Sequence, residues 1–399
     1  MTIEPDAKAT ESPVRQTFLP YNRPEIDGAD IEEVLDTLRS GWITTGPKTK
    51  EFERRFADYC GVRHAIAVNS CTGGLHVALA AAGIGPGDEV IVPTMTFCAT
   101  ANVVAHVGAT PVIVDVEPDT LNIDPQCVQA AITSRTRAVL PVHLYGHPCR
   151  MDRIGEIARA HHLLVIEDAA HAVGAEWRQQ RIGALSPATA FSFYATKNLT
   201  TAEGGMITTN DDEYARQMRI WVLHGMSHDA WNRYSAEGSW YYEVIAPGFK
   251  YNLTDLQAAL GLHQLERLET MIQTRTLLAG LYGAGLSDLA EVELPAQQPG
   301  IRHAWHLYPI RLRLETLRIN RAQFINQLRN EGIGTSVHFI PLHRHPYYRE
   351  RFGLQNANFP VADAAYERLI SLPLYTKMTP SDVQDVVEAV RRIVRRYRR

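Results

Sequence analysis

Residues Leu163 to His171 read Leu-Leu-Val-Ile-Glu-Asp-Ala-Ala-His, an apolar run that ends in two carboxylates. A continuous apolar run bounded by turn residues is typical of a strand buried on both faces. Parallel α/β sheets place their ligands at the C-terminal ends of the strands, where Asp168 stands. The stretch therefore predicts a buried parallel strand that carries Asp168 to a binding site. The alternative for this carboxylate is the N-cap of a following helix.

Similar apolar runs recur on both sides of this strand, with helical patterns between them. The runs lie at His64–Val68, Val90–Pro93, Pro111–Asp115 and Ala138–His143, and the helical patterns at Asp30–Ser40, Thr49–Cys60, Leu75–Ala82, Thr100–Val107 and Asp152–His162. Gly41 is expected to end the first of these helices. The alternation predicts a doubly wound, mostly parallel sheet.

The chain changes character toward its C-terminus. A long helix is expected over Leu256–Leu281, and after Pro295 an Arg/Leu alternation at Tyr308–Leu314 predicts a half-exposed strand. Further helices are expected near Arg321–Glu331 and Pro380–Arg399. We therefore divide the chain into a flexible tail (1–16), a large α/β domain (17–265) and a small C-terminal α+β domain (266–399).

Composition excludes several classes of protein. The 399 residues carry 40 basic and 44 acidic side chains, a net charge of −4, which argues against a protein that coats nucleic acid or an anionic membrane. No apolar stretch reaches the length of a transmembrane helix, and the first residues lack a signal-peptide pattern. The five cysteines form no Cys-x-x-Cys pair, and no third ligand joins His143 and His147 at a metal-binding spacing. We expect a cytoplasmic protein without a metal site.

Lysine is rare in this chain. The lysines are Lys8, Lys48, Lys50, Lys197, Lys250 and Lys377, and the other basic residues are arginines. Lys197 follows the uncharged, aromatic run Ala190–Thr196. A lysine withdrawn from water has a lowered pKa and forms Schiff bases with aldehydes, which arginine cannot do. The alternative is a lysine whose stem lies on apolar surface while its amine reaches solvent.

A phosphate site is indicated by a strand, a turn of small residues and a helix over Val68–Leu79. The helix N-terminus offers free N–H groups, Thr72 adds a hydroxyl, and Gly73 lets the backbone approach a ligand closely. An ordinary helix cap is the alternative. Ser192 is a second candidate for the same phosphate. Phosphate seat, carboxylate and Schiff-base lysine are together the groups that pyridoxal 5′-phosphate (PLP) requires.

The sequence resembles the DegT/DnrJ/StrS family of PLP-dependent sugar-nucleotide aminotransferases over about residues 18–395. The likeness is carried by Phe18-Leu19-Pro20, Ser40 to Lys48, Ile166 to Gly174, Gly248 to Asp255, His303 to Leu307 and Ser371 to Leu374. Within the family it is most similar to the aminotransferase that makes UDP-4-amino-4-deoxy-L-arabinose. It departs from that enzyme at His338 to His343 and at Tyr194, where that enzyme has histidine.

The resemblance implies an α/β fold of PLP-dependent transferase fold type I, aspartate aminotransferase-like, with a mostly parallel seven-stranded sheet in the large domain. It also implies site residues. Lys197 would form the internal aldimine and Asp168 would pair with the pyridinium nitrogen; Thr72, Gly73 and Ser192 would hold the phosphate, Phe97 would stack on the ring, and His171 would lie near the ring hydroxyl. Thr44, Tyr194 and His338 would bind the sugar substrate. Lys250 and Asn252 would cross a homodimer interface into the partner's site.

The expected function is transfer of an amino group from glutamate, which leaves 2-oxoglutarate, to the keto group of a UDP- or dTDP-linked ketosugar, at C4. The same fold also serves sugar 3-dehydrases, but these replace the Schiff-base lysine with histidine, and Lys197 argues against that chemistry. A C3-aminating enzyme and a non-catalytic regulator of the same fold are the alternatives.

Overall fold

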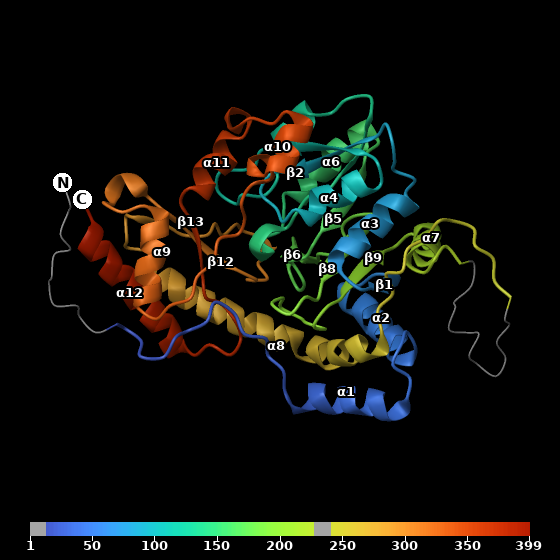
Figure 1. Cartoon of the computed structure of the whole chain (residues 1–399), viewed down its shortest axis with the longest axis horizontal. Coiled ribbons are helices and arrows are strands. Elements are labelled where there is room, and N and C mark those ends of the chain that lie inside the picture. Colours follow the sequence, from blue (N-terminus) through green and yellow to red (C-terminus); the bar gives the residue numbers. More distant parts are fainter. Residues whose placement is uncertain (1–12, 227–240) are drawn as a thin grey trace.

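Seven strands form the central sheet of the computed structural model, in the order β1-β9-β8-β5-β4-β2-β3 (Figure 1). They are β1 (His64–Val68), β2 (Glu89–Pro93), β3 (Thr110–Val114), β4 (Thr136–Val139), β5 (Leu164–Asp168), β8 (Ala188–Ser192) and β9 (Gly205–Thr209). Only β9 runs antiparallel to its neighbours in this sheet. The expected mostly parallel seven-stranded sheet is therefore confirmed. Strands β8 and β9 were not predicted from the sequence.

Helices cover both faces of this sheet. One face carries α3 (Cys71–Ala81), α4 (Ala99–His106) and α7 (Asp212–Val222); the other carries α2 (Pro47–Cys60), α5 (Pro125–Ala130), α6 (Met151–His161) and the first half of α8 (Asp255–Leu286). Strand β1 has an apolar sequence because helices cover both of its faces. Ile66 and Val68 pack toward α3, while Ala65 and Ala67 pack toward α2 and α8. Both faces of the strand are buried, so neither tolerates polar side chains.

Capping residues set the helix ends. Asp27 and Asp30 form a reciprocal capping box that starts α1 (Gly28–Ser40), which lies against α8 (Figure 1). The helix ends as predicted at Gly41, whose φ of +74° favours glycine. Thr254 and Gln257 form the corresponding box at the start of α8.

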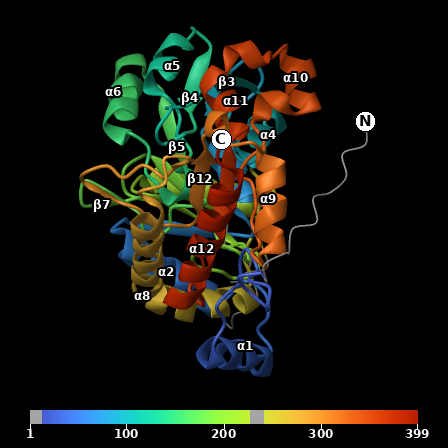
Figure 2. The ribbon, with the colours of Figure 1, turned by 90° about the vertical axis from the view of Figure 1, so that its left-hand side faces the viewer.

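The C-terminal part contains a second sheet in the order β10-β12-β13. Its strands are β10 (Val292–Glu293), β12 (Tyr308–Leu312) and β13 (Leu369–Leu372), and α9 (Arg321–Asn330), α12 (Pro380–Tyr397) and the second half of α8 pack on it (Figure 2). The prediction of a half-exposed strand here was wrong, because all five residues of β12 are buried. Arg311, which suggested exposure, donates instead to the carbonyl of Pro118 and pairs with Glu293.

Shorter elements complete the described chain. They are a three-stranded sheet of β11 (Ile301–Arg302), β6 (Glu176–Trp177) and β7 (Gln180–Arg181), the helices α10 (Pro346–Phe352) and α11 (Pro360–Tyr366), and 3-10 turns at Leu144–Gly146, Leu314–Thr316, Leu342–Arg344 and Asn356–Asn358. Helices α10 and α11 pack against the large-sheet core, although they lie late in the sequence.

The structure describes residues 13–226 and 241–399. Most of the tail expected over residues 1–16 therefore lies outside the described residues. Arg15, which is described, pairs with Asp382 (2.7 Å) and Asp385 (2.6 Å) of α12. The boundary expected at 265/266 falls inside α8, which is continuous and contributes to the cores of both parts. Among the described helices, none has the length and apolarity needed to cross a membrane.

Two glycines of α8 generate a prediction about stability. A Cβ at Gly261 would lie 2.6 Å from the Phe52 ring of α2, whereas a Cβ at Gly280 would have nothing within 4 Å. We expect Gly261→Ala to lower the free energy of unfolding by about 1–3 kcal/mol through overpacking. Gly280→Ala, the matched control, should raise it by up to about 1 kcal/mol through helix propensity. Thermal unfolding midpoints would check this, and equal midpoints for the two variants would contradict the packing.

Candidate active site

A cavity of about 400 Å³ lies at the carboxyl ends of β5 and β8. Seven separate segments line it: the start of α3, the loop after β2, the segments that follow β5 and β8, residues near the N-terminus, and two loops of the C-terminal part. Its lining includes Tyr21, Asn22, Ser70, Cys71, Thr72, Phe97, Asp168, His171, Ser192, Tyr194, Lys197, Glu203, His306, His338 and Phe339. Most of the residues that the sequence singled out are therefore gathered in one place.

Lys197 contributes an amine to this cavity. The turn after β8 is closed by the Lys197 amide, which donates to the carbonyl of Tyr194 at 2.9 Å. The surrounding protein desolvates the amine and lowers its pKa to about 8, although the nearby Asp168 carboxylate opposes this shift. An amine with this pKa is neutral in about one-tenth of molecules at pH 7 and about half at pH 8, far more than an ordinary lysine, and a nucleophile must be neutral.

Asp168 is held by two hydrogen bonds and lies near a thiol. The Thr100 hydroxyl donates to Oδ2 at 2.8 Å, and the Ala170 amide donates to Oδ1 at 3.1 Å. The Cys71 thiol lies 3.8 Å from Oδ1. The alternative role of Asp168 as the N-cap of a helix is wrong, because residues 169–175 form turns and no helix begins there.

The N-terminus of α3 faces the same cavity through Ser70, Cys71 and Thr72. The first intrahelical hydrogen bond is made by Gly74 to the carbonyl of Ser70, so the N–H groups of Cys71 and Thr72 precede the helical ladder. The Ser70 side chain caps the amide of Gly73 at 3.0 Å. Gly73 does not line the cavity, but a Cβ there would lie 2.8 Å from Oδ1 of Asn69. The same helix end can therefore be capped by Ser70 and still offer the N–H groups of Cys71 and Thr72 to an anion.

Two imidazoles form part of the wall, with ring centroids 4.4 Å apart. Nδ1 of His171 accepts from the amide of Tyr145 at 3.2 Å, which leaves its hydrogen on Nε2. Nδ1 of His306 lies 3.3 Å from Oδ1 of Asn198, whose amide nitrogen already donates to Ala304, so His306 carries its hydrogen on Nδ1. Burial lowers the pKa of both rings well below the usual value. His171 therefore offers a donor at Nε2, and His306 offers an acceptor.

Phe97 is 58% exposed at this cavity, and its ring centroid lies 5.9 Å from that of Phe339. The residues expected to bind sugar divide into two groups. Tyr194 and His338 line the cavity, and burial lowers the pKa of His338 to about 4. Thr44 does not line the cavity of its own subunit.

Lys250 and Asn252 also lie outside this cavity. The Lys250 amine donates to Oδ1 of Asn252 at 2.5 Å, and the Asn252 amide donates to the Thr45 hydroxyl at 2.6 Å. Residues 250–252 nevertheless run beside the turn that precedes α3, because the Asn69 amide donates to the carbonyl of Tyr251 at 2.7 Å.

Sequence reasoning did not assign several residues of the site. Tyr21 and His306 line the cavity, and Thr100 contacts the lining residue Asp168; only His306 stands in a motif that carried the family resemblance. Thr100 reaches the site through its hydrogen bond to Asp168, and Tyr21 through a stack on His338 with centroids 5.4 Å apart. Because these contacts join segments far apart in the sequence, no spacing of residues within one segment predicts them.

The residues present fit PLP. The cavity places hydroxyls and free N–H groups of the α3 end, with Ser192, at the same site as the Lys197 amine and the Asp168 carboxylate. Aromatic and imidazole rings supply flat walls for a heteroaromatic ring. These are the three kinds of group that the cofactor's phosphate, aldehyde and ring nitrogen need.

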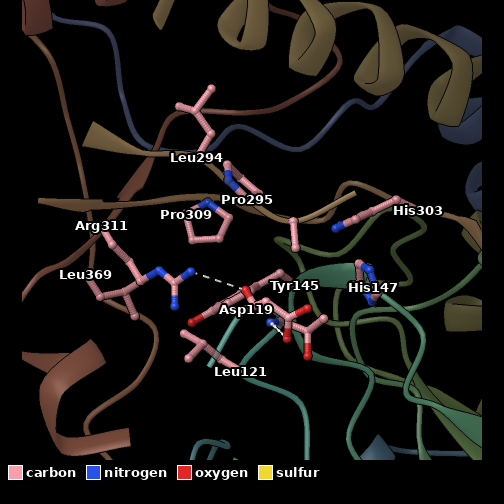
Figure 3. Close-up of a pocket in the computed structure, with 12 residues that line it drawn as sticks. Asp119, Leu121, Tyr145, His147, Leu294, Pro295, His303, Pro309, Arg311 and Leu369 are labelled. Carbon is pink, nitrogen blue, oxygen red and sulfur yellow. Dashed lines mark hydrogen bonds between the residues drawn. The ribbon is translucent and has the colours of Figure 1, made fainter. Parts of the chain in front are cut away.

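A second cavity lies between β12 and the loop after β3, and it is lined by Asp119, His147, His303 and Arg311 (Figure 3). Its volume of about 20 Å³ suits a single water molecule rather than a cofactor. Arg311 spans it by donating to the carbonyls of Pro118 and Asp119. This cavity therefore lies in the packing contact between β12 of the C-terminal sheet and the loop that follows β3 of the large sheet.

Comparison with known proteins gives a consistent result. Residues 24–391 match the model of the DegT/DnrJ/EryC1/StrS aminotransferase family. The chain is 53% identical over 382 residues to the spore coat polysaccharide biosynthesis protein SpsC of Bacillus subtilis, which covers 96% of this chain and 98% of SpsC. It is also 53% identical over 381 residues to the uncharacterized protein MJ1066 of Methanocaldococcus jannaschii, covering 96% of this chain and 99% of MJ1066.

Among solved structures, a similar one is the putative sugar aminotransferase Spr1654 of Streptococcus pneumoniae. Its PMP form superimposes with a TM-score of 0.89 at 37% identity, covering 95% of this chain and 99% of that one. Its PLP form gives a TM-score of 0.88 at 36% identity, covering 95% and 99%.

The lowered pKa of Lys197 predicts how the apoprotein reacts with PLP. Only the neutral amine attacks an aldehyde, so the rate of cofactor attachment should rise with pH and level off above about 8. Stopped-flow absorbance of the apoprotein mixed with PLP would measure this profile. Lys197→Arg should fold but attach no cofactor, since a guanidinium stays protonated. A rate that continues to climb toward pH 10 would contradict the desolvated amine.

Proposed function

The chain belongs to the DegT/DnrJ/EryC1/StrS aminotransferase family, and on that premise we propose that it transfers an amino group from L-glutamate to C4 of a nucleotide-linked ketosugar. It is a PLP-dependent sugar aminotransferase; the donor, the nucleotide and the ring position are the proposal. One observation carries it: the Lys197 amine and the Asp168 carboxylate line one cavity with the N-terminus of α3.

We assign the cofactor's contacts to residues of this cavity. Lys197 would hold it covalently, Asp168 would pair with the ring nitrogen, and Thr72 with Ser192 would bind the phosphate at the α3 end. PLP supplies an aldehyde carbon that takes up the amino group and a ring that stores the electron pair. Phe97 and His171 would enclose the ring from the loops after β2 and β5.

Lys197 has two tasks in this proposal. Before the donor binds, its amine holds the cofactor. When it is not bound to the cofactor, the Lys197 amine would move the proton that leaves the donor's α-carbon, a task for a base with a pKa near 8. The Asp168 carboxylate would favour a protonated ring nitrogen. Release of 2-oxoglutarate, which takes up one water, would precede binding of the ketosugar, so the kinetics should be ping-pong.

Tyr194 and His338 are proposed to contact the sugar. Both line the cavity, Tyr194 from the turn after β8 and His338 from a C-terminal loop. Tyr21, stacked on His338, extends the same wall. Rings of this kind suit the apolar face of a pyranose, while the hydroxyl of Tyr194 and the nitrogens of His338 suit its polar edges. The nucleotide we propose is UDP or dTDP.

The active unit is proposed to be a homodimer with shared sites. Thr44, Lys250 and Asn252 are absent from the lining of the chain's own cavity, as residues that serve a neighbouring subunit would be. An apolar stretch that includes Val244 (64% exposed) and Ile245 (54% exposed) precedes Lys250. Exposed apolar side chains in sequence are typical of a surface that a partner covers. We place this dimer in the cytoplasm, since the five cysteines are all unpaired.

A substrate screen tests the proposed reaction. The PLP-loaded protein is mixed with glutamate and a panel of UDP- and dTDP-linked 4-ketosugars and 3-ketosugars, and products are identified by mass and NMR. We expect 2-oxoglutarate and a 4-amino sugar nucleotide in equal amounts, and no product from Lys197→Ala. Amination at C3 alone would overturn the C4 assignment, and bleaching of the cofactor by another amino acid but not by glutamate would overturn the donor.

Mixed dimers test the shared site. Lys197→Ala and the double variant Lys250→Ala/Asn252→Ala should each be inactive as homodimers. In a heterodimer of the two, one site holds both lesions and the other holds none. Activity should recover to at most about a quarter of wild type, from random pairing with one intact site in two. Failure to recover after proven subunit exchange would show that the segment does not serve the partner.

A further inference from the structure

A chain of two buried hydroxyls stands behind Asp168. Thr100 is completely buried and Thr96 is 2% exposed. The Thr100 hydroxyl lies 2.8 Å from Oδ2 of Asp168 and 2.7 Å from the Thr96 hydroxyl. Both threonines belong to the stretch that also carries Phe97, between the end of β2 and the first turn of α4. This stretch therefore reaches the cavity with Phe97 and reaches Asp168 with Thr100.

The direction of these hydrogen bonds follows from the atoms. A carboxylate has only acceptors, and a threonine hydroxyl has one hydrogen. Thr100 must therefore give its hydrogen to Asp168, because the carboxylate oxygen at 2.8 Å can only accept, whereas the Thr96 hydroxyl at 2.7 Å can itself donate. The Phe97 carbonyl, at 3.3 Å, is farther away. The remaining lone pairs of Thr100 then accept from Thr96. The order is Thr96 to Thr100 to Asp168, and each bond polarises the next.

The acceptor sites of Asp168 can also be counted. Oδ1 faces the Ala170 amide at 3.1 Å and the Cys71 thiol at 3.8 Å, while the thiol lies closer to the Ala190 carbonyl, at 3.4 Å. Among the described residues, Oδ2 accepts from Thr100 alone and so keeps one lone pair for a further donor. The side chain is thus held at both oxygens, and Oδ2 keeps an acceptor position for a further donor.

We propose that Thr100, supported by Thr96, is a positioning residue that orients the free acceptor of Asp168 toward the ring nitrogen of the cofactor. This inference rests on the proposed pairing of Asp168 with that nitrogen. A hydrogen bond donated to a carboxylate stabilises its charged form. Without the Thr100 hydroxyl, the carboxylate competes more strongly for the proton on the ring nitrogen and loses one of its two anchored oxygens.

The experiment compares five variants. Thr100→Val removes the hydroxyl at nearly constant shape, Thr100→Ser retains it, and Thr96→Val removes only the second donor. Thr189→Val is the matched control, because its buried hydroxyl donates to a different carboxylate, Glu167, at 3.0 Å. Asp168→Asn removes the charge itself. For each variant we would measure the PLP dissociation constant of the apoprotein, the absorbance spectrum of bound PLP against pH, and the single-turnover rate with glutamate.

For Thr100→Val we expect PLP affinity and the single-turnover rate each to fall by on the order of tenfold, the usual effect of losing one hydrogen bond to a charged group. The pH dependence of the spectrum should shift as well. Thr100→Ser should restore all three values, Thr96→Val should change them less in the same direction, and Thr189→Val should leave the spectrum unchanged.

Three results would overturn the inference. The first is wild-type affinity and spectra in a folded Thr100→Val protein while Asp168→Asn alters both; the proposed function then stands and only the positioning role fails. The second is an equal spectral change in Thr189→Val, which would mark a general effect of a lost hydroxyl. The third is an unaltered Asp168→Asn protein, which would remove the pairing on which both the inference and the site assignment rest.

Discussion

An amine and a carboxylate line the same cavity, and the need to hold both there organises the surrounding structure. Desolvation lowers the pKa of Lys197 to about 8, so the protein makes a reactive amine by withholding solvent from it. The same withdrawal would be costly for Asp168 without the donors of Thr100 and Ala170. Burial therefore has two consequences: it lowers the pKa of the Lys197 amine, and it requires hydrogen-bond donors for the Asp168 carboxylate.

The sheet makes this burial possible. Strand β5 ends at Asp168 and β8 ends at Ser192, and the two strands are parallel neighbours, so their carboxyl ends open on the same edge. Strand β9 returns antiparallel beside β8 and brings Gly205 close to the first turn of α3. A Cβ on Gly205 would lie 2.6 Å from the backbone of Ser70, so only glycine lets the strand and the N-terminus of α3 approach this closely. The cavity lies where the carboxyl ends of β5 and β8 meet the N-terminus of α3.

The C-terminal part closes the cavity and is tied to the large sheet through α8. Arg275, buried in the middle of that helix, donates to the carbonyls of Trp305 (3.1 Å) and Leu374 (3.0 Å). The loop that it holds carries His306, and the Tyr145 hydroxyl of the large part donates to the carbonyl of His338 at 2.5 Å. The loops that carry His306 and His338 are thus held in place by hydrogen bonds from Arg275 and Tyr145. A site that positions a substrate requires such fixed supports.

The sequence alone determined the parallel sheet, its flanking helices and the family, because apolar periodicity, helix caps and short motifs are local properties. It also pointed to Lys197 and Asp168, since a rare lysine after an apolar run and an acid at a strand end are visible without a fold. The burial of β12 and the absence of a helix after Asp168 were decided by tertiary structure, through the bonds of Arg311 and the turns at 169–175. Thr100 and His306 likewise entered the site only on folding. Their roles depend on hydrogen bonds to Asp168 and Asn198, which lie 68 and 108 residues away along the chain, and no pattern within one segment encodes such a contact.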